Sequence, residues 1–163
     1  MTDDRSEPTG DDIVHRMAAR GIVLPGAASP AANYVPWVTS LGHVFIAGQA
    51  PIVDGRYPWT GRVGADVSLV DAQHGARVCG LNLLAQVHAA IDGDWGRLVR
   101  CVRLCGYVSG APGFFDFPKV VVGCSDLMVE ALGDAGRHAR SAIGAAGLRF
   151  NVPVIVDAVF EVR

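Results

Sequence analysis

The C-terminal stretch from Pro153 to Val162 constrains the fold more than any other part of the chain. Apolar and mixed positions alternate strictly along it, which is the period-two pattern of a β-strand with one buried face. The wholly apolar positions are Val154, Val156, Ala158, Phe160 and Val162, and the mixed ones are Ile155, Asp157, Val159 and Glu161. We therefore predict a strand whose apolar face packs against helices and whose other face meets a cleft, a subunit interface or water.

A second strand, centred on Ser141, precedes this one, and the two are separated by a turn over Gly147–Asn151. Arg140 stands at the start of that strand, where its guanidinium can point into a cleft. An arginine provides a planar, permanently charged set of donors that binds carboxylates in a bidentate way. We predict that Arg140 is the functional residue, and the alternative is an arginine that makes a salt bridge at a surface or interface.

Three helices are expected. The longest spans Ser68–Ile91, where apolar residues recur every three or four positions and Ser68 with Asp71 resembles a capping box. Another runs from about Phe117 to Leu132 with Asp116 as its cap, and its run of three valines from Val120 requires burial to offset a poor helix propensity. A short helix over Ile13–Arg20 is predicted to be capped by Asp11 or Asp12.

Further strands are expected at Tyr34–Ser40, His43–Gly48 and Arg97–Ser109, with a minor hairpin around Pro51–Trp59 because Asp54-Gly55 is a strong turn signal. The order of elements predicts the α+β class: a mixed sheet of about five to six strands with two long helices on one face and a short extra N-terminal helix. Residues 1–10 read as a disordered tail and residues 11–163 as one domain.

The overall composition indicates which classes of partner the chain can have. Half of the 163 residues are hydrophobic and 18% are charged, yet no apolar run reaches the length of a membrane span. Excess apolar surface on a soluble chain is usually covered by another copy, so an oligomer is expected. The net charge of −2 argues against nucleic acid as a partner. The acidic, polar N-terminus is unlike a signal peptide, which favours a cytoplasmic location.

The four cysteines lack the spacing of a zinc or redox motif. Cys79 and Cys124 fall in helical patterns, whereas Cys101 and Cys105 stand four apart in one strand and are therefore expected on the same face. We interpret all four as small core residues, with a catalytic thiol as the alternative.

Four stretches in this order resemble the Rid (reactive-intermediate deaminase, or YjgF-like) family, which has a chorismate-mutase-like fold. They are SPAANYVPWV, VFIAGQAP with its DG turn, DFPKVVVGCSDLMVEALG and GRHARSAIGAAGLRFNVPVIVDAVFEV. Together they cover roughly residues 28–162. The resemblance implies a homotrimer with three clefts at its subunit interfaces. It also implies a small enamine or imine substrate, hydrolysed to a keto compound and ammonia, and no metal or organic cofactor.

The resemblance also implies roles for single residues. Arg140 matches the arginine that binds the substrate carboxylate, and Tyr34 matches a tyrosine that lines the same cleft. Ala142 is placed among the substrate-binding residues. Gln49 belongs to the substrate-binding set as well, and we expect it to hold backbone near the pocket. For Tyr34, a half-buried core or interface position is the alternative.

Three departures from the family pattern matter. Ile155 stands where active deaminases have a glutamate that orients water, Val122 where they often have an asparagine, and Ala47 where many have a serine. All three positions belong to the predicted substrate-binding wall. Imine hydrolysis needs a positioned water and a proton for the leaving nitrogen, and a pocket that has lost its carboxylate is less able to supply either.

Nearby side chains are candidate replacements for the glutamate. Asp157 and Glu161 lie on the same strand face as Ile155, about 7 and 20 Å along the strand, so Asp157 is the one within reach. Asp157 can equally serve as an interface ion-pair partner. His138 shares the side of Arg140 by alternation and is a possible acid or base.

Several functions stay open at this point. The first is hydrolysis of small enamines or imines, with Arg140 anchoring a carboxylate. The second is a re-purposed enzyme of a biosynthetic pathway, which cyclises, condenses, isomerises or decarboxylates an imine-like intermediate in a water-poor cleft. The third is a non-catalytic trimer that binds a small molecule. RNA cleavage, attached to some relatives of the family, is the weakest because the chain lacks a basic stripe.

Overall fold

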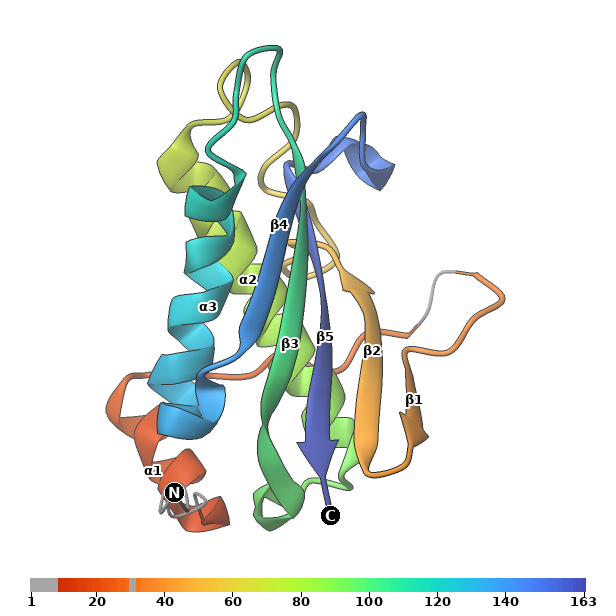
Figure 1. Cartoon of the computed structure of the whole chain (residues 1–163), viewed down its shortest axis with the longest axis vertical. Coiled ribbons are helices and arrows are strands. Elements are labelled where there is room, and N and C mark those ends of the chain that lie inside the picture. The colour runs from red at the N-terminus through yellow and green to blue at the C-terminus, as the bar shows by residue number, and fades with distance from the viewer. Residues whose placement is uncertain (1–8, 30–31) are drawn as a thin grey trace.

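The computed structural model of the chain describes residues 9–29 and 32–163, and the strands among them form one five-stranded sheet (Figure 1). The predicted disordered tail lies outside the described residues up to position 8. The helices are α1 (Gly10–Ala19), α2 (Leu69–Ala90) and α3 (Phe117–Leu132), and the strands are β1 (Trp37–Ser40), β2 (His43–Gln49), β3 (Leu98–Ser109), β4 (Ala139–Ala145) and β5 (Val154–Val162). Short 3-10 turns lie at Trp95–Arg97, Gly133–Gly136 and Arg149–Asn151.

The sheet has the strand order β1-β2-β5-β3-β4. Only the β3–β4 pair is parallel, and the other pairs are antiparallel. The two long helices lie side by side and cover one face, as Figure 1 shows, while the described residues place no helix on the opposite face. The predicted α+β class, with a mixed sheet and a short extra N-terminal helix, is confirmed.

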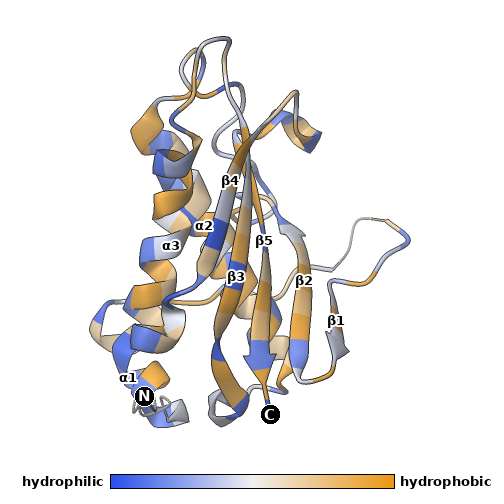
Figure 2. Ribbon diagram, in the orientation of Figure 1, coloured by the Kyte–Doolittle hydropathy of each residue, from blue (hydrophilic) through white to orange (hydrophobic). Residues whose placement is uncertain are grey.

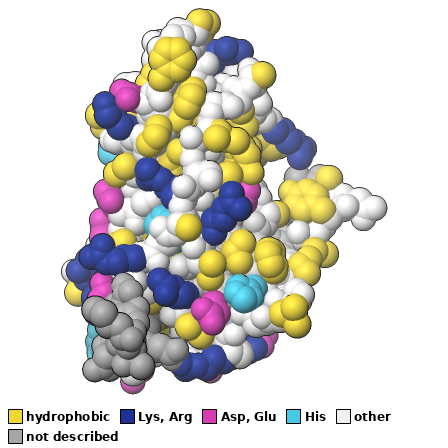
Figure 3. Space-filling view, in the orientation of Figure 1, with side chains coloured by type: hydrophobic (Ala, Val, Ile, Leu, Met, Phe, Trp, Pro, Cys, Tyr) yellow, Lys and Arg dark blue, Asp and Glu magenta, His cyan; other side chains and the backbone are white. Residues whose placement is uncertain are grey.

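The central strand β5 has the two faces that its alternation predicts. Its apolar positions from Val154 to Phe160 are buried beneath the helices, and Phe160 is among the largest fully buried side chains. The alternate positions from Ile155 to Glu161 are half-buried on the uncovered face. Figure 2 shows isolated hydrophilic positions among the apolar ones along β3 and β5. Figure 3, viewed from the same side, shows apolar side chains interrupted by charged ones.

The long helices follow their predicted bounds closely. Ser68 caps α2, since its hydroxyl accepts a hydrogen bond from the backbone N–H of Asp71 at 3.0 Å. Val120 and Val121 are fully buried, which compensates for their poor helix propensity. Asp116 is the cap residue of α3, as predicted, but its carboxylate binds the ammonium of Lys119 at 2.9 Å and makes no capping hydrogen bond to the backbone.

The helix α1 begins earlier than expected, and Gly10 is its first residue. Thr9 is its cap, because the Thr9 hydroxyl accepts from the N–H of Asp12 while the Asp12 carboxylate accepts from the N–H of Thr9. The prediction that Asp11 or Asp12 takes the cap position is therefore wrong. A reciprocal capping box satisfies two backbone donors, whereas a single aspartate cap satisfies one.

The strand β3 contains an irregularity that reverses one prediction. Cys101 pairs with Phe160 and Arg103 with Val159, so two steps along β3 match one step along β5. A bulge of this kind moves the following residues to the other face. Cys101 therefore faces the helices, whereas Cys105 pairs with Asp157 on the uncovered face. The expectation that both cysteines share a face is wrong. All four cysteines are buried and free.

Two smaller differences concern β1 and the segment after β2. β1 begins at Trp37 and not at Tyr34, because Pro36 has no backbone N–H to donate. The minor hairpin expected around Pro51–Trp59 reduces to one bridge between Val53 and Arg56, with Asp54 and Gly55 in left-handed conformations. Over residues 9–29 and 32–163, the structure contains no helix that is both long and apolar enough to cross a membrane.

Candidate functional site

Arg140 lies at the edge of the sheet, on the side of the helices. β4 is an edge strand, and Arg140 pairs there with Leu104, which is fully buried beneath the helices. Paired residues point to the same face of a sheet. The Arg140 side chain accordingly reaches α3, where Nη1 donates to the hydroxyl oxygen of Ser125 at 3.1 Å. The rest of the side chain is exposed.

His138 contacts the same hydroxyl. Its Nδ1 lies 2.6 Å from the carbonyl oxygen of Gly136, which can only accept, so Nδ1 carries the proton. Its Nε2 lies 3.0 Å from Ser125 Oγ and is left to accept the serine proton. Burial lowers the pKa of His138, and the nearby Arg140 lowers it further, against the effect of the Gly136 hydrogen bond. The neutral imidazole is therefore the favoured form at neutral pH.

These side chains line a shallow hollow of about 280 Å³, which we call the arginine hollow. α3 contributes one wall, and β4 with the segment before it contributes the other. Its lining residues are Ser125, Asp126, Val129, Arg137, His138 and Arg140. With two arginines, one neutral imidazole and one carboxylate, the arginine hollow suits a small anionic group.

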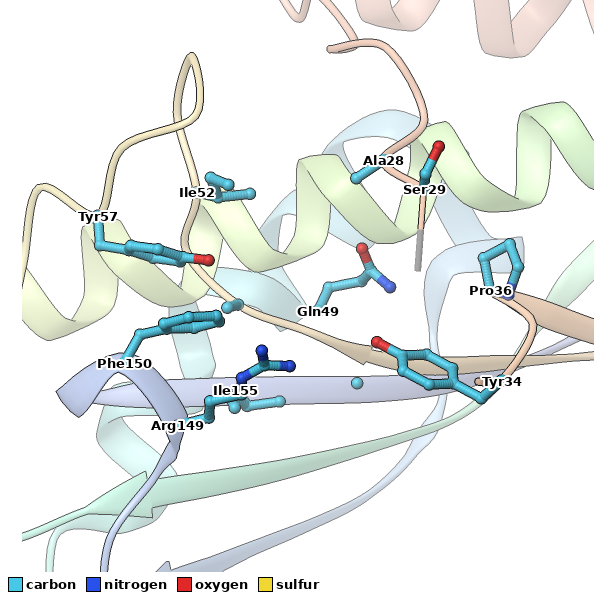
Figure 4. A pocket seen from close by; sticks show the side chains of 12 residues that line it. Ala28, Ser29, Tyr34, Pro36, Gln49, Ile52, Tyr57, Arg149, Phe150 and Ile155 are labelled. Carbon is cyan, nitrogen blue, oxygen red and sulfur yellow. The ribbon is translucent and has the colours of Figure 1, made fainter. Parts of the chain in front are cut away.

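A second, larger hollow of about 390 Å³ lies at the far end of β2 and β5. Figure 4 shows its side chains, which come from the segment before β1, from β2 and the loop after it, from the turn before β5 and from the start of β5 itself. We call it the apolar pocket. Its lining residues are Ala28, Ser29, Tyr34, Pro36, Gly48, Gln49, Ala50, Ile52, Tyr57, Arg149, Phe150 and Ile155.

The backbone of β2 bends where it enters the apolar pocket. The register between β2 and β5 shifts after Ile46, and the Gln49 amide donates from Nε2 to the carbonyl of Ala47 at 2.9 Å. A Cβ at Gly48 would lie only 2.8 Å from Cγ2 of Ile155, so only glycine lets β2 approach this closely. Ala47 is not among the lining residues of the apolar pocket, and its N–H donates to the carbonyl of Pro36.

Aromatic side chains form the far wall of the apolar pocket. The rings of Tyr57 and Phe150 stack with centroids 4.6 Å apart, and the Arg149 guanidinium lies 4.4 Å from the Phe150 centroid. Phe150 and Asn151 adopt left-handed conformations with φ of 59° and 54°. Non-glycine residues rarely adopt this region, so the turn holds the Phe150 ring over Tyr57 at a conformational cost.

Within one chain, the predicted site residues fall into two separate groups. Arg140 and His138 line the arginine hollow on the helix side, whereas Tyr34, Gln49 and Ile155 line the apolar pocket. Ile155 pairs with Tyr107 on the uncovered face, opposite to the face of Arg140. Two other predicted residues lie on the helix side and line neither hollow. They are Val122, half-buried on α3, and Ala142, packed against the core.

Asp157 lies on the uncovered face and lines neither hollow. Its carboxylate accepts a hydrogen bond from the Tyr107 hydroxyl at 2.9 Å. Interactions with Cys105 and then with Asp157 raise the pKa of Tyr107, because a phenolate beside these groups is disfavoured. Asp157 is thereby held as a partner of Tyr107.

Sequence reasoning did not find Ser125, Tyr57 or Phe150. The available signal for Ser125 was a hydroxyl on a predominantly apolar helix, and for Phe150 a bulky residue within a predicted turn. Contact between Ser125 and His138 depends on how α3 packs against β4, which no local pattern encodes. The described part of the chain holds no group of three or more His, Cys, Asp or Glu side chains that suits a metal ion.

Comparison with known proteins gives concordant results. Residues 14–161 match the family described as "YjgF/chorismate mutase-like, putative endoribonuclease". Protein TCP17 of Trypanosoma cruzi is 41% identical over 144 residues, which cover 88% of this chain and 89% of that protein.

Two solved structures are also similar. Atu1372 from Agrobacterium tumefaciens is 41% identical with a TM-score of 0.86, over 94% of this chain and 95% of that one. A "putative endoribonuclease" from Shewanella oneidensis is 29% identical with a TM-score of 0.88, over 95% and 100%. The motifs, the α+β topology and these relatives agree, and the chain belongs to the Rid family of YjgF/chorismate mutase-like proteins.

Proposed function

We propose that the chain is a Rid-type enzyme that acts on small enamine or imine intermediates and hydrolyses them to a keto compound and ammonia. Arg140 anchors the carboxylate of the substrate. The observation that carries this proposal is the split of the candidate site: one chain presents a basic hollow on the helix side of its sheet and, apart from it, an apolar pocket at the end of β2 and the start of β5. The basic hollow suits the carboxylate of an imino acid, and the apolar pocket suits its side chain.

Arg140 is suited to this role by its position. One N–H of Nη1 binds Ser125, and a guanidinium has five donors, so enough remain for a bidentate carboxylate contact. The carboxylate of a 2-imino acid is bonded directly to the imine carbon. Holding the carboxylate at Arg140 therefore brings the reacting carbon into the arginine hollow.

The apolar pocket would receive the side chain of the substrate from a neighbouring copy. Phe45, Val38 and Ile143 are about half exposed on the uncovered sheet face, and such a surface is typical of one that another copy covers. A homotrimer in which the arginine hollow of one copy meets the apolar pocket of the next joins both halves of the site. The four free thiols fit a reducing compartment such as the cytoplasm.

Ile155 suits binding in the apolar pocket but weakens the case for hydrolysis there. A methyl-lined wall cannot orient water, so a re-purposed reaction of an imine-like intermediate, or binding without reaction, are the competing functions. We favour imine hydrolysis because the arginine hollow contains the polar side chains Ser125, Asp126 and His138 beside Arg140.

The first test is an assay with 2-aminoacrylate or a 2-imino acid generated in the reaction mixture. Release of ammonia should exceed the buffer control, and Arg140→Ala should lower kcat/KM on the order of 100-fold through loss of the charged hydrogen bonds. Arg20→Ala, on the exposed end of α1, is the matched control and should leave the rate unchanged. Wild-type rates equal to buffer would exclude deamination. Calorimetry with a small carboxylate would then decide between binding and a re-purposed site.

Because relatives are named as endoribonucleases, RNA cleavage is the second candidate. The net charge of −2 disfavours it, since binding to phosphates needs a basic footprint. Incubation with a labelled single-stranded RNA should give no cleavage above the control. Cleavage that Arg140→Ala abolishes would replace the deaminase proposal.

A further inference from the structure

The hydroxyl of Ser125 lies between a base and a cation. Arg140 Nη1 donates to its oxygen at 3.1 Å, while His138 Nε2 lies 3.0 Å away in position to take its proton. The Gly136 carbonyl fixes the imidazole with its lone pair toward the serine, at 2.6 Å from Nδ1. A serine is a weak nucleophile unless an adjacent base removes its proton, and the base is in turn held by a third group. All three parts are present here.

The surroundings leave the hydroxyl accessible. Ser125 and His138 are half-buried, and both line the arginine hollow of about 280 Å³. The other charged groups facing the pair are Asp126 from α3, together with Arg137 and Arg140 from the opposite wall. Arg137 Nε donates to the carboxylate of Asp134 at 3.1 Å.

We propose that Ser125 is an activated nucleophile and that the arginine hollow carries acyl-transfer activity toward small carboxylic esters. This activity uses the same hollow and Arg140 but is a different reaction from imine hydrolysis, and it does not depend on that hydrolysis. Nothing in the family assignment or in the relatives assigns a role to Ser125 or to its pairing with His138.

The reaction proceeds in two balanced steps. Ser125 Oγ attacks the acyl carbon and its proton moves to His138 Nε2, while the guanidinium of Arg140 stabilises the oxyanion. Collapse breaks the bond to the leaving alkoxide, which takes the proton from His138 and departs as an alcohol, leaving an ester on Ser125. Water then attacks this ester and gives a proton to His138. Collapse returns that proton to Ser125 Oγ and releases the carboxylic acid.

The test is covalent labelling of the full-length protein with an alkyl fluorophosphonate, a probe for activated serines, followed by peptide mass spectrometry. We expect one adduct, on Ser125, and none in Ser125→Ala. His138→Gln should slow labelling by about 100-fold or more, the usual contribution of a general base. Ser141→Ala is the matched control, since Ser141 lies on β4 but accepts a hydrogen bond from Arg103 on the other side of the strand.

A pH series separates activation from mere support of the fold. Labelling requires neutral His138, so its rate should fall as the pH drops below 6.5 towards the lowered pKa of His138. In His138→Gln this fall should disappear. Hydrolysis of p-nitrophenyl acetate by the wild type should follow the same pH dependence.

If Ser125→Ala disturbs the fold, a second variant still tests the proposal. Ser125→Cys retains the shape of the side chain, and its thiol should react rapidly with iodoacetamide at pH 7 while the buried native thiols react slowly. Absence of any adduct on Ser125, labelling at another serine, or equal rates in wild type and His138→Gln would overturn the proposal. Ser125 would then serve only to join α3 to β4.

Discussion

The two faces of the sheet differ in the side chains that they carry and in how far the helices cover them. On the helix side, β5 contributes an unbroken apolar row from Val154 to Val162, and its burial drives folding of the single chain. On the uncovered side, the row from Ile155 to Glu161 alternates apolar and acidic residues and is only half-buried in the single chain. One strand therefore serves stability with one face and, as we propose, assembly and substrate binding with the other.

The largest effect should come from the helix side. Phe160→Ala removes a fully buried ring and should lower the free energy of unfolding by about 3–5 kcal/mol. Phe45→Ala, on the uncovered face with 48% exposure, should cost less than about 1 kcal/mol when the chain is monomeric. Urea titration at a concentration that keeps the chain monomeric measures both. Equal losses would contradict the division between the two faces.

A smaller effect is expected from restoring a carboxylate to the uncovered face. Ile155→Glu places an acid at the apolar pocket and should raise imine hydrolysis by about 100-fold, the low end for general acid–base catalysis. Ile155→Gln has a similar shape without the charge and should give no gain. The ratio of their kcat/KM values is the measurement. No difference between them would show that the pocket serves a reaction other than hydrolysis.

The smallest effect concerns pH and the arginine hollow. Burial lowers the pKa of His138 in the folded chain, so below the ordinary value of 6.5 the unfolded chain binds more protons than the folded one. The free energy of unfolding should therefore rise with pH between the folded pKa and 6.5, and fall as the solution is acidified. His138→Gln should flatten this slope in urea titrations at a series of pH values. An unchanged slope would place the acid sensitivity in other groups.

Much of the fold was predictable because it follows local rules. The 3.6-residue period and Ser68 cap of α2, the period-two pattern of β5 and the bounds of α3 were all confirmed. These features depend on residues close together in sequence. Side chains return to the same face after about one turn of a helix or after two residues of a strand.

One prediction failed because it depends on pairing between distant segments, and another failed because of a local competition. The bulge in β3 that separates the faces of Cys101 and Cys105 exists only against the register of β5. The Thr9 capping box depends on a choice among three polar residues that compete for one position.

The sequence alone determined the family, the α+β class and Arg140 as a candidate anchor, because motifs and periodicity depend only on residues that are near one another in the sequence. Only the tertiary structure decided that Arg140 and Ile155 lie on opposite faces, and that Ser125 meets His138 across 13 positions. Long-range packing of α3 against β4 and the register of five strands set those contacts. Packing and strand register depend on contacts throughout the core, between segments far apart in the sequence. Local propensities cannot predict them.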